Sequence, residues 1–108
     1  MPDEVPIAVI VRFNGDSDEL FEGFEKARQR WMAARRENGY NAPNFYAVAK
    51  TDDGIVIVDC FDTDEDHKAF GRNMGEYLEA VGMPGPDHLE HLEVSKLGWD
   101  HLEAASQA

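Results

Sequence analysis

The sequence predicts an α+β fold in which the elements follow one another as strand, helix, strand, strand, helix, strand. Three observations predict it. Residues 5–13 and 54–61 are near-continuous apolar runs of the length of strands covered on both faces. Two other segments carry apolar residues three and four positions apart behind capping signals, which is typical of amphipathic helices. A turn sequence also joins two adjacent strand-like segments as a hairpin.

The run at residues 54–61 contains four consecutive β-branched residues and is predicted to lie near the centre of the sheet. Asp59 interrupts it, and a carboxylate in a buried strand needs a partner or a function. Cys60 is the one cysteine of the chain, so no internal disulfide can form. Its place within the strand indicates a small buried apolar group rather than a reactive thiol.

The first helix is predicted to follow the strand at residues 5–13 after the turn Asn14-Gly15-Asp16. Asp16 and Glu19 have the spacing of a capping box, and Gly39 is suited to a left-handed cap at the other end. The apolar stripe of this helix consists of Leu20, Phe24, Ala27, Trp31 and Ala34.

The second half of the chain begins with a strand at residues 44–50, and Asp53-Gly54 predicts a type I′ turn before the central strand. Thr63 and Asp66 predict the cap of a second helix. The apolar stripe of that helix consists of Phe70, Met74, Tyr77, Leu78 and Val81, and the helix stops at Gly82. Residues 88–97 alternate imperfectly and also fit helical spacing; we interpret them as a strand because the element order needs a fourth.

This order is that of the ferredoxin-like βαββαβ unit, a four-stranded antiparallel sheet with both helices on one face. The first and third strands are central in it, and they are the two most apolar strands here. Because the other sheet face is too apolar for water, we expect it to pair with the same face of a second copy, giving a homodimeric α+β barrel. We expect one domain over residues 1–108, with a core at 5–97 and a flexible or swapped tail at 98–108.

The chain has 108 residues and a formal net charge of −12. A surface this acidic repels phosphate backbones and anionic lipid headgroups, so we expect neither a nucleic-acid nor a membrane partner. No apolar run approaches the roughly 18–20 residues of a membrane span, and the acidic N-terminus lacks the basic charge of a signal peptide. With its single cysteine, the chain is expected to be cytoplasmic.

The chain resembles the dimeric α+β barrel superfamily, and within it the antibiotic-biosynthesis-monooxygenase-like and related small bacterial proteins. The resemblance covers residues 5–97. It rests on the element order, on the strand at 55–61 followed by Asp-Thr-Asp-Glu-Asp-His-Lys-Ala-Phe at 62–70, and on Gly-Met-Pro-Gly-Pro at 82–86. A strand ending in aromatic and polar residues before an acidic, capped helix that carries an aromatic is common in that group.

The resemblance implies a small-molecule enzyme that needs no metal and no organic cofactor. Its chemistry would be oxygenation of an activated phenol-like substrate, or isomerisation, cyclisation or elimination led by proton transfer. Because this group also contains haem-degrading enzymes and proteins without a known reaction, three alternatives stay open. One is a non-catalytic dimer that binds a small apolar or aromatic molecule, and another is a haem-binding or haem-degrading relative. The third is a structural domain with no ligand.

Two side chains are candidate catalytic bases. Asp59 would have a raised pKa if it is desolvated, and it is catalytic only if it faces the pocket rather than the dimer interface. His67 lies in the first turns of the second helix, near the end of the central strand. His88 and His91 have the composition of a metal site, but on a strand they point to opposite faces, so we expect no metal there.

The chain is rich in aromatic residues, which predicts a cavity for a flat apolar ligand between helices and sheet. Trp31 and Tyr77 lie on the inner stripes of the two helices, and Asn73 is near Tyr77. The residues expected to bind the substrate are Arg12, Trp31, Tyr46, Phe70, Asn73 and Tyr77.

Overall fold

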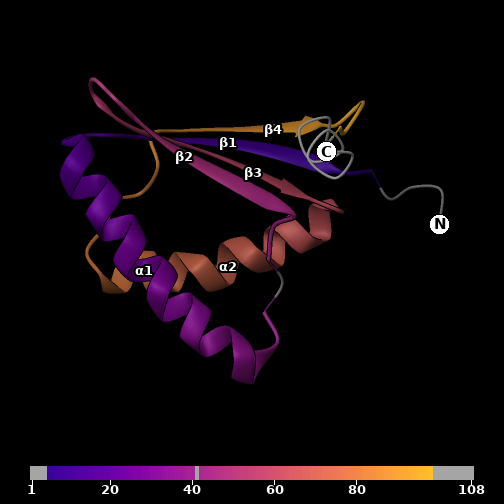
Figure 1. The fold of residues 1–108 in the computed structure, drawn as a ribbon, viewed down its shortest axis with the longest axis horizontal. Coiled ribbons are helices and arrows are strands. Elements are labelled where there is room, and N and C mark those ends of the chain that lie inside the picture. Colours follow the sequence, from indigo (N-terminus) through magenta and orange to yellow (C-terminus); the bar gives the residue numbers. More distant parts are fainter. Residues whose placement is uncertain (1–4, 41, 99–108) are drawn as a thin grey trace, which may run out of the picture.

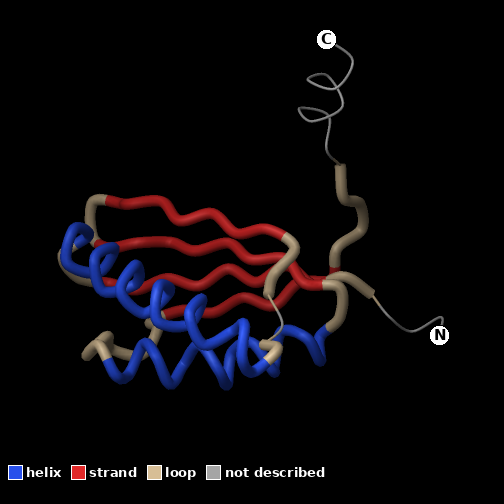
Figure 2. The backbone as a smooth tube through the Cα atoms, turned by 60° about the horizontal axis from the view of Figure 1, so that its bottom comes forward, coloured by secondary structure: helices blue, strands red, loops and turns tan. Residues whose placement is uncertain are grey.

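The computed structural model describes residues 5–40 and 42–98. Its elements, in order, are β1 (Ile7–Asn14), α1 (Ser17–Asn38), β2 (Phe45–Thr51), β3 (Gly54–Phe61), α2 (Asp64–Ala80) and β4 (His88–Glu93). The strands form one antiparallel sheet in the order β2-β3-β1-β4, and both helices lie against the same face of it (Figures 1 and 2). The predicted ferredoxin-like α+β fold is confirmed. Most of the tail at 98–108, for which we expect flexibility or swapping, lies outside the described residues.

Both helices begin where their capping signals predict. The Asp16 carboxylate accepts a hydrogen bond from the Glu19 backbone N–H at 2.9 Å, and the Thr63 hydroxyl accepts one from the Asp66 N–H at 3.0 Å. Gly39 ends α1 with φ 66°, the left-handed conformation that glycine adopts without a steric penalty. Neither helix is long and apolar enough to span a membrane within residues 5–40 and 42–98.

The hairpin between β2 and β3 differs from the predicted type I′ turn at Asp53-Gly54. Because Thr51 pairs with Gly54, the two turn residues are Asp52 and Asp53, and no described non-glycine residue has a positive φ. A type I′ turn needs a positive φ at both central residues, so that prediction was wrong. Gly54 serves another purpose: a Cβ there would overlap the backbone carbonyl of Phe13 on β1. Glycine is needed at this position because two strands approach closely.

Alternation along the strands gives the sheet two different faces. From β3, Ile55, Ile57, Asp59 and Phe61 face the helices, and all four are buried. They pack with side chains from β1 and with the inner stripes of the helices, whose buried members are Leu20, Phe24, Ala27, Trp31, Phe70 and Met74. The helix-covered face therefore holds both the core of the domain and Asp59.

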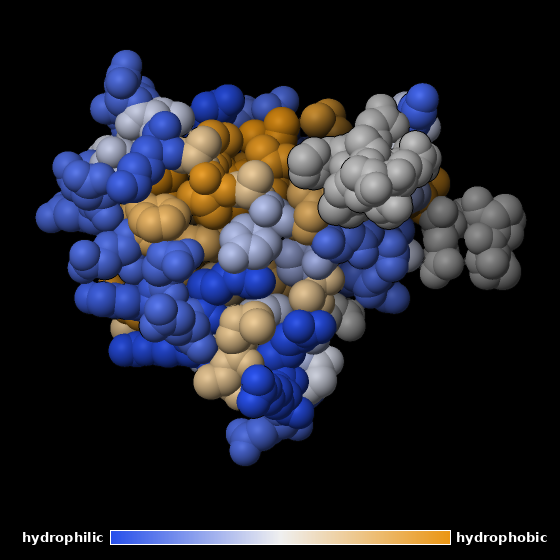
Figure 3. Space-filling view, viewed as in Figure 1, coloured by the Kyte–Doolittle hydropathy of each residue, from blue (hydrophilic) through white to orange (hydrophobic). Residues whose placement is uncertain are grey.

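Neither of the two described helices lies over the opposite face of the sheet, and we call it the open face. Its side chains alternate with those of the core, and the strand register assigns to it Ala8, Ile10, Arg12, Phe45, Ala47, Ala49, Val56, Val58, Cys60, His88, Glu90 and Leu92. Apolar side chains predominate in this set, and Figure 3 shows apolar side chains gathered over the strands, bordered by hydrophilic ones. Leu92 is 47% exposed and Phe45 is 37% exposed, so part of this apolar surface faces solvent.

Candidate functional site

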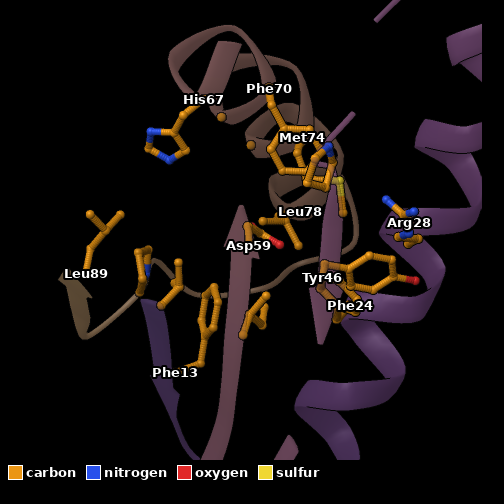
Figure 4. Close-up of a pocket in the computed structure, with 16 residues that line it drawn as sticks. Phe13, Phe24, Arg28, Tyr46, Asp59, His67, Phe70, Met74, Leu78 and Leu89 are labelled. Carbon is orange, nitrogen blue, oxygen red and sulfur yellow. The ribbon is translucent and has the colours of Figure 1, made fainter. Parts of the chain in front are cut away.

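A pocket of about 210 Å³ lies between the sheet and the two helices (Figure 4). Most of its wall is apolar, built from Val11, Phe13, Phe24, Ile57, Phe70, Met74, Leu78 and Leu89 together with glycines and prolines. The polar side chains that line it are Arg28, Tyr46, Asp59 and His67. An apolar cavity with a few polar groups is the usual form of a small-molecule site.

Asp59 reaches the pocket because it lies on the helix-covered face of β3, directly across from Tyr46 on β2. The residue is 8% exposed, and Figure 4 shows its carboxylate pointing from the strand into the pocket. Burial raises the pKa of Asp59 from 3.8 to about 6, while the positive charge of Arg28 acts in the opposite direction. The sequence left open which face Asp59 takes, and the structure places it on the pocket face.

Arg28 projects from α1 towards the same part of the pocket. Its guanidinium carbon is 4.1 Å from the ring centroid of Tyr46 and 5.1 Å from that of Trp31, the geometry of cation–π contacts. No carboxylate among the described residues forms an ion pair with this guanidinium. It can therefore bind an anionic group of a ligand beside Asp59.

Sequence reasoning missed Arg28, although the sequence carries a signal for it. Arg28 comes four residues after Phe24 and three before Trp31, so it lies beside the apolar stripe of α1 rather than on its solvent side. A cation at such a position has to cover or enter the core. The signal was masked because α1 also carries Lys26, Arg30, Arg35 and Arg36.

His67 lines the opposite end of the pocket (Figure 4). Its ring centroid is 5.2 Å from that of Phe61 and 4.9 Å from that of His91 on β4. Burial, and next the neighbouring His91, lower the pKa of His67, which favours the neutral imidazole. Asp59 and His67, the two candidate bases, thus line one pocket from different sides.

No protein-family profile matches the sequence, and no curated protein matches it either. Among solved structures, a proposed antibiotic biosynthesis monooxygenase from Caulobacter crescentus aligns with a TM-score of 0.57 at 17% identity, over 86% of this chain and 92% of its own. A protein of unknown function from Nitrosomonas europaea aligns with a TM-score of 0.55 at 17% identity, over 89% and 95%. This likeness confirms the fold. SnoaB, a cofactor-independent oxygenase from Streptomyces nogalater, aligns at 12% identity with a TM-score of 0.49, over 88% and 96%.

Within this shared fold, two of the predicted substrate-binding residues line the pocket. Tyr46 lies across the sheet from Asp59, and Phe70 projects from α2. Phe70 belongs to the predicted apolar stripe of the second helix, and both side chains form part of the pocket wall.

The other four predicted substrate-binding residues are not among the residues that line this pocket. Trp31 is fully buried, with its ring against Phe70 at 5.3 Å and Tyr40 at 6.3 Å between centroids, so it packs as core. The Tyr77 hydroxyl lies 3.5 Å from the Tyr40 hydroxyl. The remaining two are Arg12, exposed on the open face of β1, and the half-buried Asn73 of α2.

Proposed function

We propose that the protein is an enzyme that removes a proton from a small, largely apolar aromatic substrate, with Asp59 as the general base. The observation that carries the proposal is the buried Asp59 carboxylate in an apolar pocket, with a pKa of about 6. A base with this pKa is mostly ionised at neutral pH and holds a proton more firmly than an ordinary carboxylate. Perturbed pKa values of this kind cluster at functional sites.

The size of the pocket supports a single-ring substrate. Its volume of about 210 Å³ lies below the roughly 300–1,000 Å³ of pockets for drug-sized ligands. It lies above the roughly 150 Å³ of an apolar cavity that binds benzene. A substituted phenol or a molecule of similar size fits between these limits, with its ring against Phe70 and Tyr46 and its oxygen towards Arg28.

The residues around the pocket define one first step for the reaction. Asp59 takes a proton from an acidic O–H or C–H group, and the resulting substrate anion is stabilised by the Arg28 guanidinium. Return of the proton at another atom is an isomerisation. With O₂ as a second substrate, a CH₂ group activated by the phenol is oxidised to a carbonyl. One atom of O₂ becomes the carbonyl oxygen, and the other leaves as water with the two hydrogens. The fold likeness to a proposed antibiotic biosynthesis monooxygenase agrees with this second outcome.

Ligand binding and turnover test the proposal together. Single-ring phenols are titrated by protein-observed NMR, and O₂ uptake or product formation is then followed for those that bind. Leu78→Phe narrows the pocket and is expected to weaken binding about tenfold or more, the cost of one or two misplaced methylenes. Met32→Phe adds a similar volume at an exposed position on α1 that does not line the pocket, and it is the matched control. Equal binding by both variants would place the ligand outside this pocket. Binding without turnover would indicate a ligand-binding protein that is not an enzyme.

We also infer that two copies pair through their open faces. The support is the apolar, partly exposed surface that includes Ile10, Ala47, Val58 and Leu92, since soluble monomers rarely expose such a contiguous patch. Sedimentation at micromolar concentration is expected to show a dimer for the wild-type chain and a monomer for Val58→Glu. Met32→Glu changes an exposed apolar residue on α1 and is expected to leave the dimer intact. A wild-type monomer would contradict the pairing.

A further inference from the structure

Three side chains with metal-ligating atoms converge beside the His67 end of the pocket. Asp64 and His67 stand one helical turn apart at the start of α2, and His91 lies on the helix-covered side of β4, paired with Val9. The His91 Nε2 atom is 2.9 Å from Asp64 Oδ1 and 3.1 Å from His67 Nδ1. One ligand atom from each of the three residues lies within 4.8 Å of the other two.

Protons alone do not satisfy this cluster. A ring nitrogen carries at most one proton, so His91 Nε2 cannot donate to both of its close neighbours. The Asp64 Oδ1 atom is buried and accepts no hydrogen bond from the described part of the chain, despite its distance of 2.9 Å from that nitrogen. If His67 Nδ1–H donates to His91 Nε2, that nitrogen carries no proton, and Asp64 Oδ1 is left without a donor from it. A buried acceptor without a donor is costly, and a cation among the three atoms satisfies all of them.

The spacing of these atoms is close to that of metal ligands. Around a tetrahedral ion with bonds of roughly 2.0–2.1 Å, neighbouring ligand atoms are about 3.3 Å apart. The two separations from His91 Nε2, 2.9 and 3.1 Å, are near this value, and a ligand atom from each of the three residues lies within 4.8 Å of the other two. The second oxygen of Asp64 is 3.2 Å from the Lys68 ammonium, which leaves Oδ1 as the single ligand atom of this carboxylate.

The charges around the cluster act in both directions. The Lys68 ammonium and the N-terminal end of α2 disfavour a cation. The three acidic residues of the first helical turn, Asp64, Glu65 and Asp66, together with the net charge of −12, favour one. The ligand set decides the kind of ion, because two imidazoles and one carboxylate select zinc or another first-row transition metal over calcium or magnesium.

We propose that Asp64, His67 and His91 bind one divalent first-row transition metal ion at the edge of the pocket. Three protein ligands leave at least one coordination position for water or for a polar group of a bound molecule. His67 belongs both to this cluster and to the pocket wall, so the ion lies next to the substrate space. The metal site does not involve Asp59, so the proposed proton-transfer function does not depend on metal binding.

The test is metal binding by the full chain prepared without a histidine tag and without substrate. Zinc is titrated by calorimetry, and cobalt(II) absorption reports the coordination geometry. We expect one equivalent of zinc and the intense visible bands of tetrahedral cobalt. His91→Gln removes a ligand and is expected to weaken zinc binding by more than the roughly 10–100-fold lost when a residue that only hydrogen-bonds to a ligand is replaced. His88→Gln is the matched control, because His88 lies on the same strand but faces the other side of the sheet, 3.3 Å from Glu90.

A second variant, His67→Gln on α2, provides an independent test should His91→Gln disturb the edge strand, which circular dichroism would reveal. The proposal fails if the wild-type chain binds no zinc at sub-millimolar concentration, or if His91→Gln and His67→Gln bind as tightly as the wild type. A loss of binding in His88→Gln equal to that in His91→Gln would also overturn it. Asp59→Asn is expected to bind zinc normally, which separates this result from the fate of the proposed catalytic function.

Discussion

Asp59 and Asp64 lie five residues apart and near one pocket, yet their surroundings differ in kind. Asp59 is 8% exposed, lies among apolar side chains and forms no hydrogen bond or ion pair with the described residues. The Asp64 side chain is 42% exposed and contacts Lys68 and His91. The difference comes from position, since Asp59 lies in the middle of a central strand and Asp64 in the first turn of a helix. The same functional group therefore suits proton transfer at one end of the pocket and ligation at the other.

The largest effect is expected from Asp59→Asn on turnover. Since the amide cannot accept the proton, kcat is expected to fall about 10²–10⁴-fold, the usual contribution of a general base. The measurement is kcat for a substrate identified among single-ring phenols, with substrate binding checked by NMR. Asp52→Asn, in the exposed turn between β2 and β3, is the control and should keep wild-type turnover. Undiminished turnover in Asp59→Asn would show that Asp59 is a buried structural carboxylate.

The same substitution is expected to stabilise the protein at neutral pH. Because the folded-state pKa of Asp59 is raised from 3.8 to about 6, its contribution to stability is fully present below about pH 4 and is lost as the pH rises through 6. A shift of roughly two units corresponds to about 3 kcal/mol. The free energy of unfolding of Asp59→Asn should therefore exceed that of the wild type by up to about 3 kcal/mol at pH 7.

Urea denaturation of the wild type and of Asp59→Asn at pH 4 and pH 7 measures this difference in the free energy of unfolding. Comparing the two proteins at each pH cancels the effect of the other carboxylates. Asp64→Asn provides the comparison within the same protein. Its free energy of unfolding should change by only about 0–1 kcal/mol, because the contacts it loses are partly exposed. A destabilised Asp59→Asn at pH 7 would mean that the ionised carboxylate has a favourable partner in the folded protein.

The smallest effect is expected from Arg28, through the pH dependence of kcat/KM. A base with a pKa of about 6 makes kcat/KM fall about tenfold per pH unit below that value and level off above it. Arg28→Gln removes the charge that lowers the pKa of Asp59, so this acid limb is expected to move to higher pH. Arg28→Lys keeps the charge and should leave the limb near its wild-type position. If the pH dependence of kcat/KM is the same in Arg28→Gln as in the wild type, the charge of Arg28 does not affect the pKa of Asp59.

Local signals in the chain predicted most of the fold. The bounds of β3 and α1 follow directly from Gly54, from the cap at Asp16 and from the stop at Gly39, because each is a short-range preference of the backbone. The strand order followed from the ferredoxin-like order of the elements, and the apolar content of the first and third strands supported it. The type I′ turn predicted at Asp53-Gly54 was wrong. Gly54 is instead needed where its backbone approaches Phe13, forty-one residues earlier, and no local pattern contains that contact.

The site divides in the same way. The sequence by itself identified Asp59 as a carboxylate that has to be buried, because a polar residue inside an apolar run is visible without a structure. Only the tertiary structure decided that it faces the pocket, that Arg28 comes to it from α1, and that Trp31 and Tyr77 do not line that pocket. It also joined Asp64 and His67 to His91, which is 24 residues beyond His67. Which face a side chain takes, and which distant residue meets it, depends on strand register and helix packing, and these are set by the whole core at once.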